Sequence, residues 1–471
     1  MGNTESNTYD VIVIGAGISG LICGCYLSKA GKKVLIIEQH DRPGGYFTSF
    51  RRKGFLFDAA AHSFGNYREG GHVRKILTDL GVPELARIKR CNPSDMVIAP
   101  ECIVTYWNDV PSTIAGLSNI FPHEEKNIVN FFKFISSAGI SDFVKLKDKT
   151  FDFLLRQFFI DSRLRSVLAL PVFGNGGLPP SRLQAFSGIK IFSEFIVDGG
   201  YYTEGGIQAL PNALANIVKH NGGAIVYKKR VEKIIIQNGA VTGVELTNRE
   251  KLHGRIVVSA CDMRQTYTML FGDHVVDDEV TKQLNTMTPS LSTFILYMGL
   301  REPFKETPKA GVNSWYLTDW DLDATYSRVE RCDFSDVGAF MFRVSPDQKT
   351  ALAFIGAPYY SRSFWKENKR KTADEFFARI EHSIPGLREQ VAYIEAASPA
   401  TLERYTLNYQ GAAFGWAKSP SQMSAIMACK SSRLQGLLFT GHWTSIGFGL
   451  PGTCYSGYET ARRILKKEIT R

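Results

Sequence analysis

Residues 9–20 read YDVIVIGAGISG, an apolar run that leads directly into a G-x-G-x-x-G motif. The apolar run predicts a buried parallel strand, and Leu21–Ala30 predicts the helix that follows it. In this context Gly15 permits a tight turn, Gly17 lets the backbone approach a pyrophosphate, and Gly20 lets the helix pack closely on the strand. The helix N-terminus would face the phosphate charge. The stretch therefore predicts a nucleotide-binding βαβ unit.

A second apolar segment completes this unit. Residues 33–37 predict the next strand, and Glu38 follows it directly. A carboxylate at the end of the second strand can accept hydrogen bonds from both ribose hydroxyls, and it disfavours a 2′-phosphate. These residues alone leave both NAD and FAD open as the cofactor.

Composition limits the class of protein. The chain has 471 residues, 44% hydrophobic and 22% charged, which predicts about two globular domains rather than a disordered or polytopic membrane protein. The net charge of +10 favours anionic partners such as phosphorylated cofactors or acidic lipid headgroups. No recognition motif supports nucleic-acid binding. The eight cysteines include no CxxC pair, so we expect neither a metal site nor a disulfide framework, and a reducing compartment.

The first residues carry no secretory signal. The start MGNTES is polar, without a basic segment ahead of an apolar one. It matches the myristoylation pattern at Gly2, but the pattern is short and we favour a solvated N-terminal tail. We expect a cytoplasmic protein, with peripheral contact to an anionic membrane as a further expectation. No oligomeric state follows from the sequence.

The residues after Glu38 distinguish between the two cofactors. Residues 42–45 read RPGG and residues 54–58 read GFLFD. The run from 11 to 58 resembles the FAD-binding N-terminus of the flavin amine oxidase superfamily, specifically its phytoene desaturase-like branch. That branch includes carotenoid desaturases, carotenoid isomerases and retinol saturases. The resemblance implies FAD, with the paired glycines beside its ribityl and pyrophosphate portions.

Two residues depart from the family pattern. Tyr46 stands where many amine oxidases carry arginine, and His62 lies in a stretch, along the flavin, that is often glycine-rich. The resemblance therefore implies a flavin edge that differs from the family norm.

Two later segments extend the resemblance. Residues 198–210, DGGYYTEGGIQAL, resemble the segment where the family's chain re-enters the FAD domain, and in the family the position of Val231 offers backbone contacts to the adenine. Near the C-terminus, a strand at 437–441 precedes a glycine-rich loop and a helix expected from about 454 to 467. A loop that feeds a helix N-terminus can stabilise the negative charge of a reduced flavin. The family places its G…G-x-P-G loop there. The predicted FAD-binding residues are Gly15, Ala16, Gly17, Ile18, Ser19, Gly20, Glu38, Gln39, Gly44, Gly45, Tyr46, Val231, Gly441, His442, Gly449, Leu450, Gly452 and Thr453.

These segments predict an α/β fold with a Rossmann-like FAD-binding domain of the GR2 type and an inserted mixed α+β substrate domain. The FAD domain is expected to be discontinuous, over 1–70, 195–275 and 430–471. The substrate domain is expected over 71–194 and 276–429. Within it, phenylalanines interleaved with Lys and Arg between 131 and 159 have two explanations, a membrane-contacting surface or an ordinary core.

The catalytic residues are less clearly marked. His62 and His442 are candidates for moving a proton near the flavin, because the ordinary pKa of histidine lies near neutrality. Tyr405, Tyr409 and Trp416 lie in a segment that resembles the family's substrate-facing run and are expected to line the substrate pocket.

The resemblance implies an FAD-dependent oxidoreductase that desaturates, saturates or isomerises C=C bonds of an apolar, carotenoid-like isoprenoid by hydride exchange with flavin N5. Two alternatives stay open. One is a flavin amine oxidase acting on a small amine, which should need an aromatic cage and often a lysine that positions water; no such lysine is identified. The other is a prenyl-lipid carrier that keeps FAD as a structural cofactor.

Overall fold

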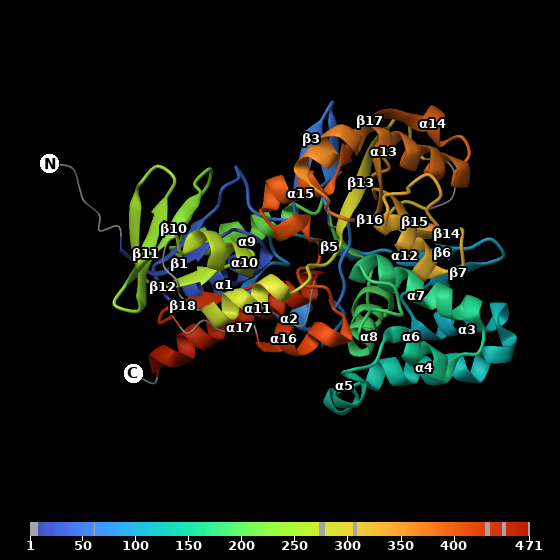
Figure 1. The fold of residues 1–471 in the computed structure, drawn as a ribbon, viewed down its shortest axis with the longest axis horizontal. Helices are drawn as coiled ribbons and strands as arrows, with labels where there is room; N and C mark the ends of the chain where they lie inside the picture. The colour runs from blue at the N-terminus through green and yellow to red at the C-terminus, as the bar shows by residue number, and fades with distance from the viewer. Residues whose placement is uncertain are drawn as a thin grey trace.

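The computed structural model describes residues 8–60, 62–272, 278–304, 309–428, 434–444 and 449–469. Gly2, where the myristoylation pattern occurs, Cys429 and residues 445–448 of the C-terminal loop lie outside these residues. Within them the fold is built around two seven-stranded sheets (Figure 1).

The first sheet contains the predicted nucleotide-binding unit. Its order is β10-β11-β12-β1-β2-β9, and β18 pairs with β12. β1 runs parallel to both β2 and β12, as do β2 to β9 and β12 to β18, whereas β10 and β11 form an antiparallel extension. The strands are β1 Thr8–Ile14, β2 Val34–Ile37, β9 Ala224–Val226, β10 Val231–Gln237, β11 Ala240–Leu246, β12 Lys251–Ser259 and β18 Leu437–Phe439. This parallel α/β sheet confirms the predicted fold class.

Three helices from distant parts of the chain pack together against this sheet. They are α1 (Ile18–Lys29), α9 (Ala209–His220) and α17 (Gly449–Ile469). α1 is buried around almost its whole circumference, which explains why its sequence is apolar without a polar stripe. α17 begins at Gly449, earlier than the expected 454, so Gly452 and Thr453 belong to the helix and not to the loop before it.

The second sheet has the order β17-β13-β16-β15-β14-β6-β7. All neighbours are antiparallel except β6 and β14. The strands are β6 Asp95–Ile98, β7 Ile103–Tyr106, β13 Ser292–Leu300, β14 Asn313–Leu317, β15 Ala339–Val344, β16 Thr350–Ala357 and β17 Val391–Ala397. All strands of the first sheet fall in the segments expected for the FAD domain, and all strands of the second in those expected for the substrate domain. The exact domain boundaries stay a prediction.

Helices cover both faces of the second sheet. Along β13 the side chains alternate, with Phe294 and Leu296 in one core and Ile295 and Tyr297 in the other. The first core is closed by α12 (Leu322–Glu330), α13 (Arg362–Ser383) and α14 (Leu387–Gln390). The second is closed by the helical layer at the lower right of Figure 1, which comprises α3 Val110–Ile120, α4 Glu125–Ser137, α5 Ile140–Leu146, α6 Phe151–Phe158, α7 Ser162–Gly176 and α8 Ala185–Ile191.

Short elements join the two halves. The remaining strands form two pairs, β3 Ser49–Arg52 with β4 Phe55–Asp58, and β5 Ile88–Arg90 with β8 Tyr201–Thr203. The remaining α-helices are α2 His72–Leu80, α10 Met263–Gln265, α11 Asp278–Thr286, α15 Pro399–Thr406 and α16 Met423–Ala428.

The phenylalanines between 131 and 159 belong mainly to the core. Phe131, Phe151 and Phe159 are at most 1% exposed, and Phe132 is 5% exposed. Their rings pack edge to face, as between Phe131 and Phe159, whose centroids are 5.2 Å apart. Of the two explanations for this segment, packing accounts for these rings. No helix in the described ranges is both long enough and apolar enough to cross a membrane.

Candidate functional site

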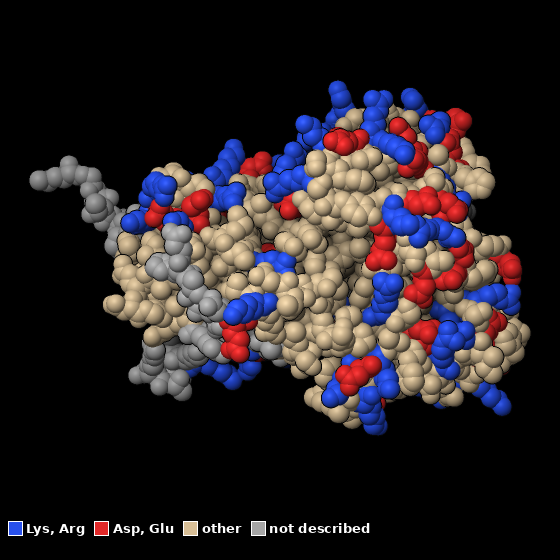
Figure 2. Space-filling view, viewed as in Figure 1, with Lys and Arg blue, Asp and Glu red and all other residues tan. Residues whose placement is uncertain are grey.

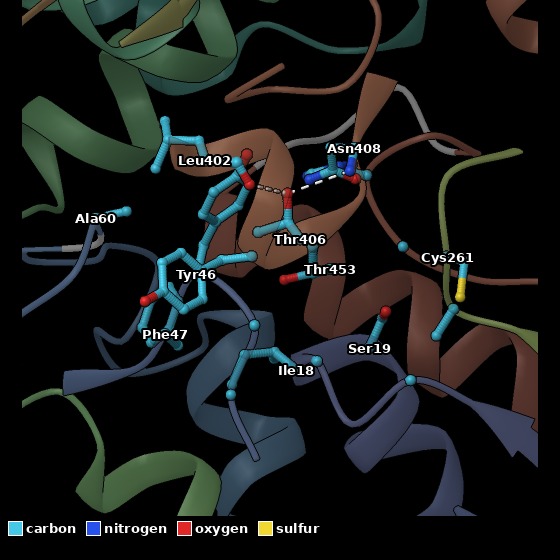
Figure 3. A pocket seen from close by; sticks show the side chains of 18 of the residues that line it. Ile18, Ser19, Tyr46, Phe47, Ala60, Cys261, Leu402, Thr406, Asn408 and Thr453 are labelled. Carbon is cyan, nitrogen blue, oxygen red and sulfur yellow. Dashed lines mark hydrogen bonds between the residues drawn. The ribbon is translucent and has the colours of Figure 1, made fainter. Parts of the chain in front are cut away.

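A cavity of about 280 Å³ opens at the carboxyl edge of the parallel strands (Figure 3). Because β1, β2, β12 and β18 run parallel, the residues that follow them meet at this edge. The cavity is therefore lined by Gly15 after β1, Glu38 after β2, Cys261 after β12 and Gly441 after β18. Segments more than 400 residues apart in sequence thus form one site.

Two helix N-termini border this cavity. α1 starts at Ile18 and α17 at Gly449, and Ile18, Ser19 and Thr453 are seen around the cavity in Figure 3. Each N-terminus leaves backbone N–H groups unpaired and carries partial positive charge. The arrangement suits a ligand with negative charge at two points, such as the pyrophosphate and the flavin ring of FAD.

The glycine loop leaves room for such a ligand. A Cβ added at Gly17 would meet no protein atom within 4 Å, so this backbone faces open space. At Gly44 the φ of +135° is one that side chains rarely adopt, and an added Cβ would lie 2.3 Å from the Phe47 carbonyl oxygen. The second glycine of the motif thus leaves space for a ligand, and Gly44 makes the turn that closes the loop.

Glu38 is fixed by the backbone around it. Its side chain is 8% exposed, and its two carboxylate oxygens accept hydrogen bonds from the N–H groups of Ala16 (2.8 Å) and His40 (2.9 Å). Ala16 itself is fully buried and does not line the cavity. The carboxylate is held at the end of β2, where the sequence predicts a ribose contact.

Most of the predicted FAD-binding residues line this cavity. Those that do are Gly15, Gly17, Ile18, Ser19, Glu38, Gln39, Gly44, Gly45, Tyr46, Val231, Gly441, His442, Gly449, Leu450 and Thr453. Ala16, Gly20 and Gly452 do not. At Gly20 the reason is packing, since an added Cβ would lie 2.2 Å from the Gly15 carbonyl oxygen.

Tyr46, one of the departures from the family pattern, ties two distant segments together. Its hydroxyl donates a hydrogen bond of 2.9 Å to the Ala412 carbonyl, and its ring lies 6.2 Å from that of His442. Figure 3 shows Tyr46 beside α15, where the Thr406 hydroxyl donates to the Leu402 carbonyl at 2.8 Å. Tyr46 therefore helps to form the wall between the glycine loop and α15.

The two candidate histidines both line the cavity, but neither has the pKa that the sequence argument assumed. Burial, and after it the charge of Arg343, lowers the pKa of His62 to about 3. Burial, and after it the charge of Lys418, likewise lowers the pKa of His442 to about 3. A buried imidazolium loses its hydration, so the neutral form is favoured. Near neutral pH both rings are therefore uncharged, which corrects the expectation that they titrate there.

The buried histidines predict an acid-dependent loss of stability. In the unfolded chain each takes up a proton near its ordinary pKa of 6.5, whereas in the folded protein each stays neutral to about 3. The contribution of the two neutral histidines to the free energy of unfolding is therefore complete above pH 6.5. It is lost as the pH falls from 6.5 toward 3. We expect His62→Gln and His442→Gln to flatten the fall in unfolding free energy in this range, measured by urea denaturation. His220→Gln, at the exposed end of α9, is the control, and equal slopes in all variants would contradict the assignment.

Of the three aromatic residues predicted to line the substrate pocket, one lines the cavity and two do not. Tyr405 lines the cavity. Tyr409 and Trp416 do not: the Arg264 guanidinium lies 4.0 Å from the centre of the Tyr409 ring, and the Trp416 indole N–H donates to the Trp443 carbonyl at 3.0 Å. Trp416 is fully buried beside the site and Tyr409 is half-buried against Arg264, so both rings are held away from the cavity.

The sequence did not reveal the apolar end of the cavity. Phe195, Ile295, Phe354, Leu402 and Phe414 line it. They come from five separate segments, and each lies in an apolar context that is typical of any core. Leu402 and Phe414 lie close in sequence to Tyr405 and Trp416, which we singled out, whereas Phe195, Ile295 and Phe354 lie far from any predicted substrate residue, so no local pattern could have identified the whole group.

Lys418 is a second residue that the sequence did not mark. It is 1% exposed, and burial lowers its pKa to about 7. It acts electrostatically on His442, but it does not line the cavity. Nothing around it in the sequence distinguishes it from other lysines.

Comparisons with known proteins identify the relatives of this chain. The family model "Flavin containing amine oxidoreductase" matches residues 18–465. The all-trans-retinol 13,14-reductase of Homo sapiens is 25% identical, over 99% of this chain and 87% of the relative. The prolycopene isomerase 2 of an Oncidium hybrid cultivar is 23% identical, over 98% of this chain and 84% of the relative. A putrescine oxidase structure superposes with a TM-score of 0.68 at 15% identity, covering 98% of this chain and 99% of the other, which shows the fold alone. These relatives confirm the resemblance to the phytoene desaturase-like branch, and the chain belongs to the family of flavin-containing amine oxidoreductases.

Proposed function

We propose that this protein is an FAD-dependent oxidoreductase that changes C=C or CH–CH bonds of an apolar isoprenoid. The observation that carries the proposal is the pairing, in one cavity, of a polar end built for a dinucleotide with an apolar end. The relatives, named for retinol and prolycopene, support the same substrate class.

FAD, rather than another flavin, is supported by the polar end of the cavity. Glu38 offers a carboxylate for a ribose, and Gly17 leaves its backbone open to a pyrophosphate. Val231 lines the same end and is proposed to contact the adenine through its backbone. A shorter flavin nucleotide lacks the adenosine that these residues would bind.

The apolar end favours a polyene over an amine. Ile295, Phe354 and Leu402 are at most 8% exposed, and Phe195 and Phe414 complete the lining. Among the described lining residues the one carboxylate is Glu38, which is proposed to bind the ribose. An ammonium ion would therefore lose its hydration here without gaining an ionic partner. Burial of a hydrocarbon, in contrast, is favourable.

The bound flavin would supply the redox chemistry by exchanging a hydride with the substrate. The protein's own residues exclude water and orient the substrate. Because His62 and His442 are neutral near pH 7, we expect them to act as hydrogen-bonding and packing groups and not as charged acids.

An anaerobic spectroscopic experiment tests the proposal. The flavin-loaded protein is mixed with all-trans-retinol or a cis-lycopene in detergent, once with oxidised and once with dithionite-reduced flavin, and products are analysed by mass. We expect a polyene to bleach the oxidised flavin, to reoxidise the reduced flavin, or to isomerise on it. These outcomes identify a desaturase, a saturase or an isomerase.

The controls separate the alternatives. Putrescine, the ligand of the amine oxidase neighbour, is the amine control, and a Gly17→Val variant without flavin is the blank. Bleaching by the amine alone would contradict the proposal and favour an amine oxidase. No reaction with any substrate or donor would favour a carrier that keeps its flavin for structural reasons.

Membrane contact stays a prediction, and so does a cytoplasmic location. The surface best suited to touch lipid is α5, where Ile140 is 85% exposed and Val144 is 60% exposed on the same helical face. Lys145 and Lys147 follow in sequence and would suit anionic headgroups.

A further inference from the structure

A second and larger cavity, of about 1030 Å³, adjoins the flavin site. It lies between β3, α13, α15 and β17, and Tyr46, Ala60, Leu402 and Tyr405 line both cavities. We call it the basic groove. The two cavities are therefore adjacent.

The basic groove is defined by lysines and arginines without ionic partners. Three of its cations are paired with carboxylates, such as Arg42 with Asp41 at 2.8 Å. Among the described residues, five others form no ion pair and are exposed: Arg52, Lys228, Arg230, Lys366 and Arg404. Figure 2 shows Lys and Arg gathered over β3, α13 and α15. The unpaired charges create a positive field at the entrance to an apolar site.

Two elements, β13 and α15, extend from the flavin cavity to the basic groove. On β13, Thr293 and Ile295 line the flavin cavity, and Tyr297, next on the same face, lines the groove. On α15, Leu402 lines both spaces, and Arg404 lines the groove alone. A long molecule can therefore place one end against Ile295 and the other beside Arg404.

Arg230 also lines the flavin cavity beside Val231 and is accounted for by the cofactor, but the cofactor's phosphates do not account for Arg52, Lys366 and Arg404. The pyrophosphate is predicted to lie at the glycine loop and the start of α1. Arg52, Lys366 and Arg404 line the groove but not the cavity that contains this loop. They come from β3, α13 and α15, which belong to neither the glycine loop nor α1.

We propose that the basic groove binds the anionic head, a phosphate or carboxylate, of an amphiphilic isoprenoid whose chain occupies the apolar end of the flavin cavity. The inference rests on the proposed function and narrows its substrate class. A neutral hydrocarbon would gain nothing from the unpaired cations, whereas a phosphate forms charge-assisted hydrogen bonds with them.

A matched pair of probes tests this inference. Geranylgeraniol and geranylgeranyl phosphate differ only in the head group, and their dissociation constants are measured in neutral detergent from the change in flavin absorbance of the loaded protein. At low salt the wild type is expected to bind the phosphate about tenfold more tightly than the alcohol. High salt and inorganic phosphate should each reduce this preference, because the groove is exposed.

The double variant Lys366→Glu/Arg404→Glu is expected to lose the preference while still binding geranylgeraniol. The control is Lys126→Glu/Lys133→Glu on α4, which makes the same change in net charge at exposed residues outside both cavities. It should behave as the wild type.

The outcomes separate this inference from the proposed function. Equal affinity for both probes in the wild type would overturn the inference and leave the proposed function standing. Binding of neither probe would count against the proposed function itself. If the double variant loses binding to phosphatidylserine vesicles but keeps its preference for the free phosphate, the groove recognises a lipid surface, and the inference is wrong.

Discussion

Gly17→Val is expected to abolish flavin binding and leave the fold intact. The φ of Gly17 is −67°, which any residue can adopt, and an added Cβ meets no protein atom within 4 Å. The new side chain would occupy the space beside the start of α1 where a pyrophosphate is predicted to lie. We expect the affinity for FAD to fall by about a hundredfold or more, because charge-assisted hydrogen bonds to the loop are lost.

Flavin content after purification and titration of the apoprotein with FAD measure this effect. Because Gly17 precedes the first helical residue, the stability of the apoprotein should fall by only about 1 kcal/mol. Retention of stoichiometric flavin by the variant would show that the glycine loop does not bind the pyrophosphate.

Gly20→Val, three residues later in the same motif, is expected to destabilise the fold itself rather than to block flavin binding alone. An added Cβ would lie 2.2 Å from the Gly15 carbonyl oxygen and 3.2 Å from the Ala260 side chain. The clash is with backbone, so α1 would have to move away from β1. We expect a loss of about 3 kcal/mol in unfolding free energy of the apoprotein.

Urea unfolding of the two apoproteins compares these effects directly. Flavin loss in the Gly20 variant should follow its unfolding, whereas the Gly17 variant should be folded and empty. If both apoproteins unfold at the same urea concentration, the division of roles between the two glycines is wrong.

The dinucleotide end of the site could be predicted from sequence because its residues are local. The strand, Gly15, Gly17, Gly20 and Glu38 occur within one βαβ unit, where spacing in the chain sets spacing in the fold. The C-terminal segment was assigned to the site through the family resemblance of its strand, glycine-rich loop and helix. The start of α17 was misjudged because glycines and Pro451 favour a loop, whereas packing against α1 holds them in the helix.

The titration of the histidines could not be predicted in this way. A pKa depends on how deeply the ring is buried and on which charges lie nearby, and the Arg343 that acts on His62 is far from it in sequence. The orientation of Tyr409 and Trp416 could not be predicted from the sequence either. Their side chains point to Arg264 and Trp443, and no pattern in residues 401–416 records that direction.

The nucleotide-binding strands, the glycine loop, the carboxylate proposed for the ribose and the family could all be predicted from the sequence, because each is carried by motifs whose residues lie close together in the chain. The fold was needed to show which residues form the apolar end, that the candidate histidines are neutral, and that unpaired cations on β3, α13 and α15 adjoin the flavin cavity. These properties come from contacts between segments brought together by two sheets, and burial and charge at such contacts are set by the whole fold.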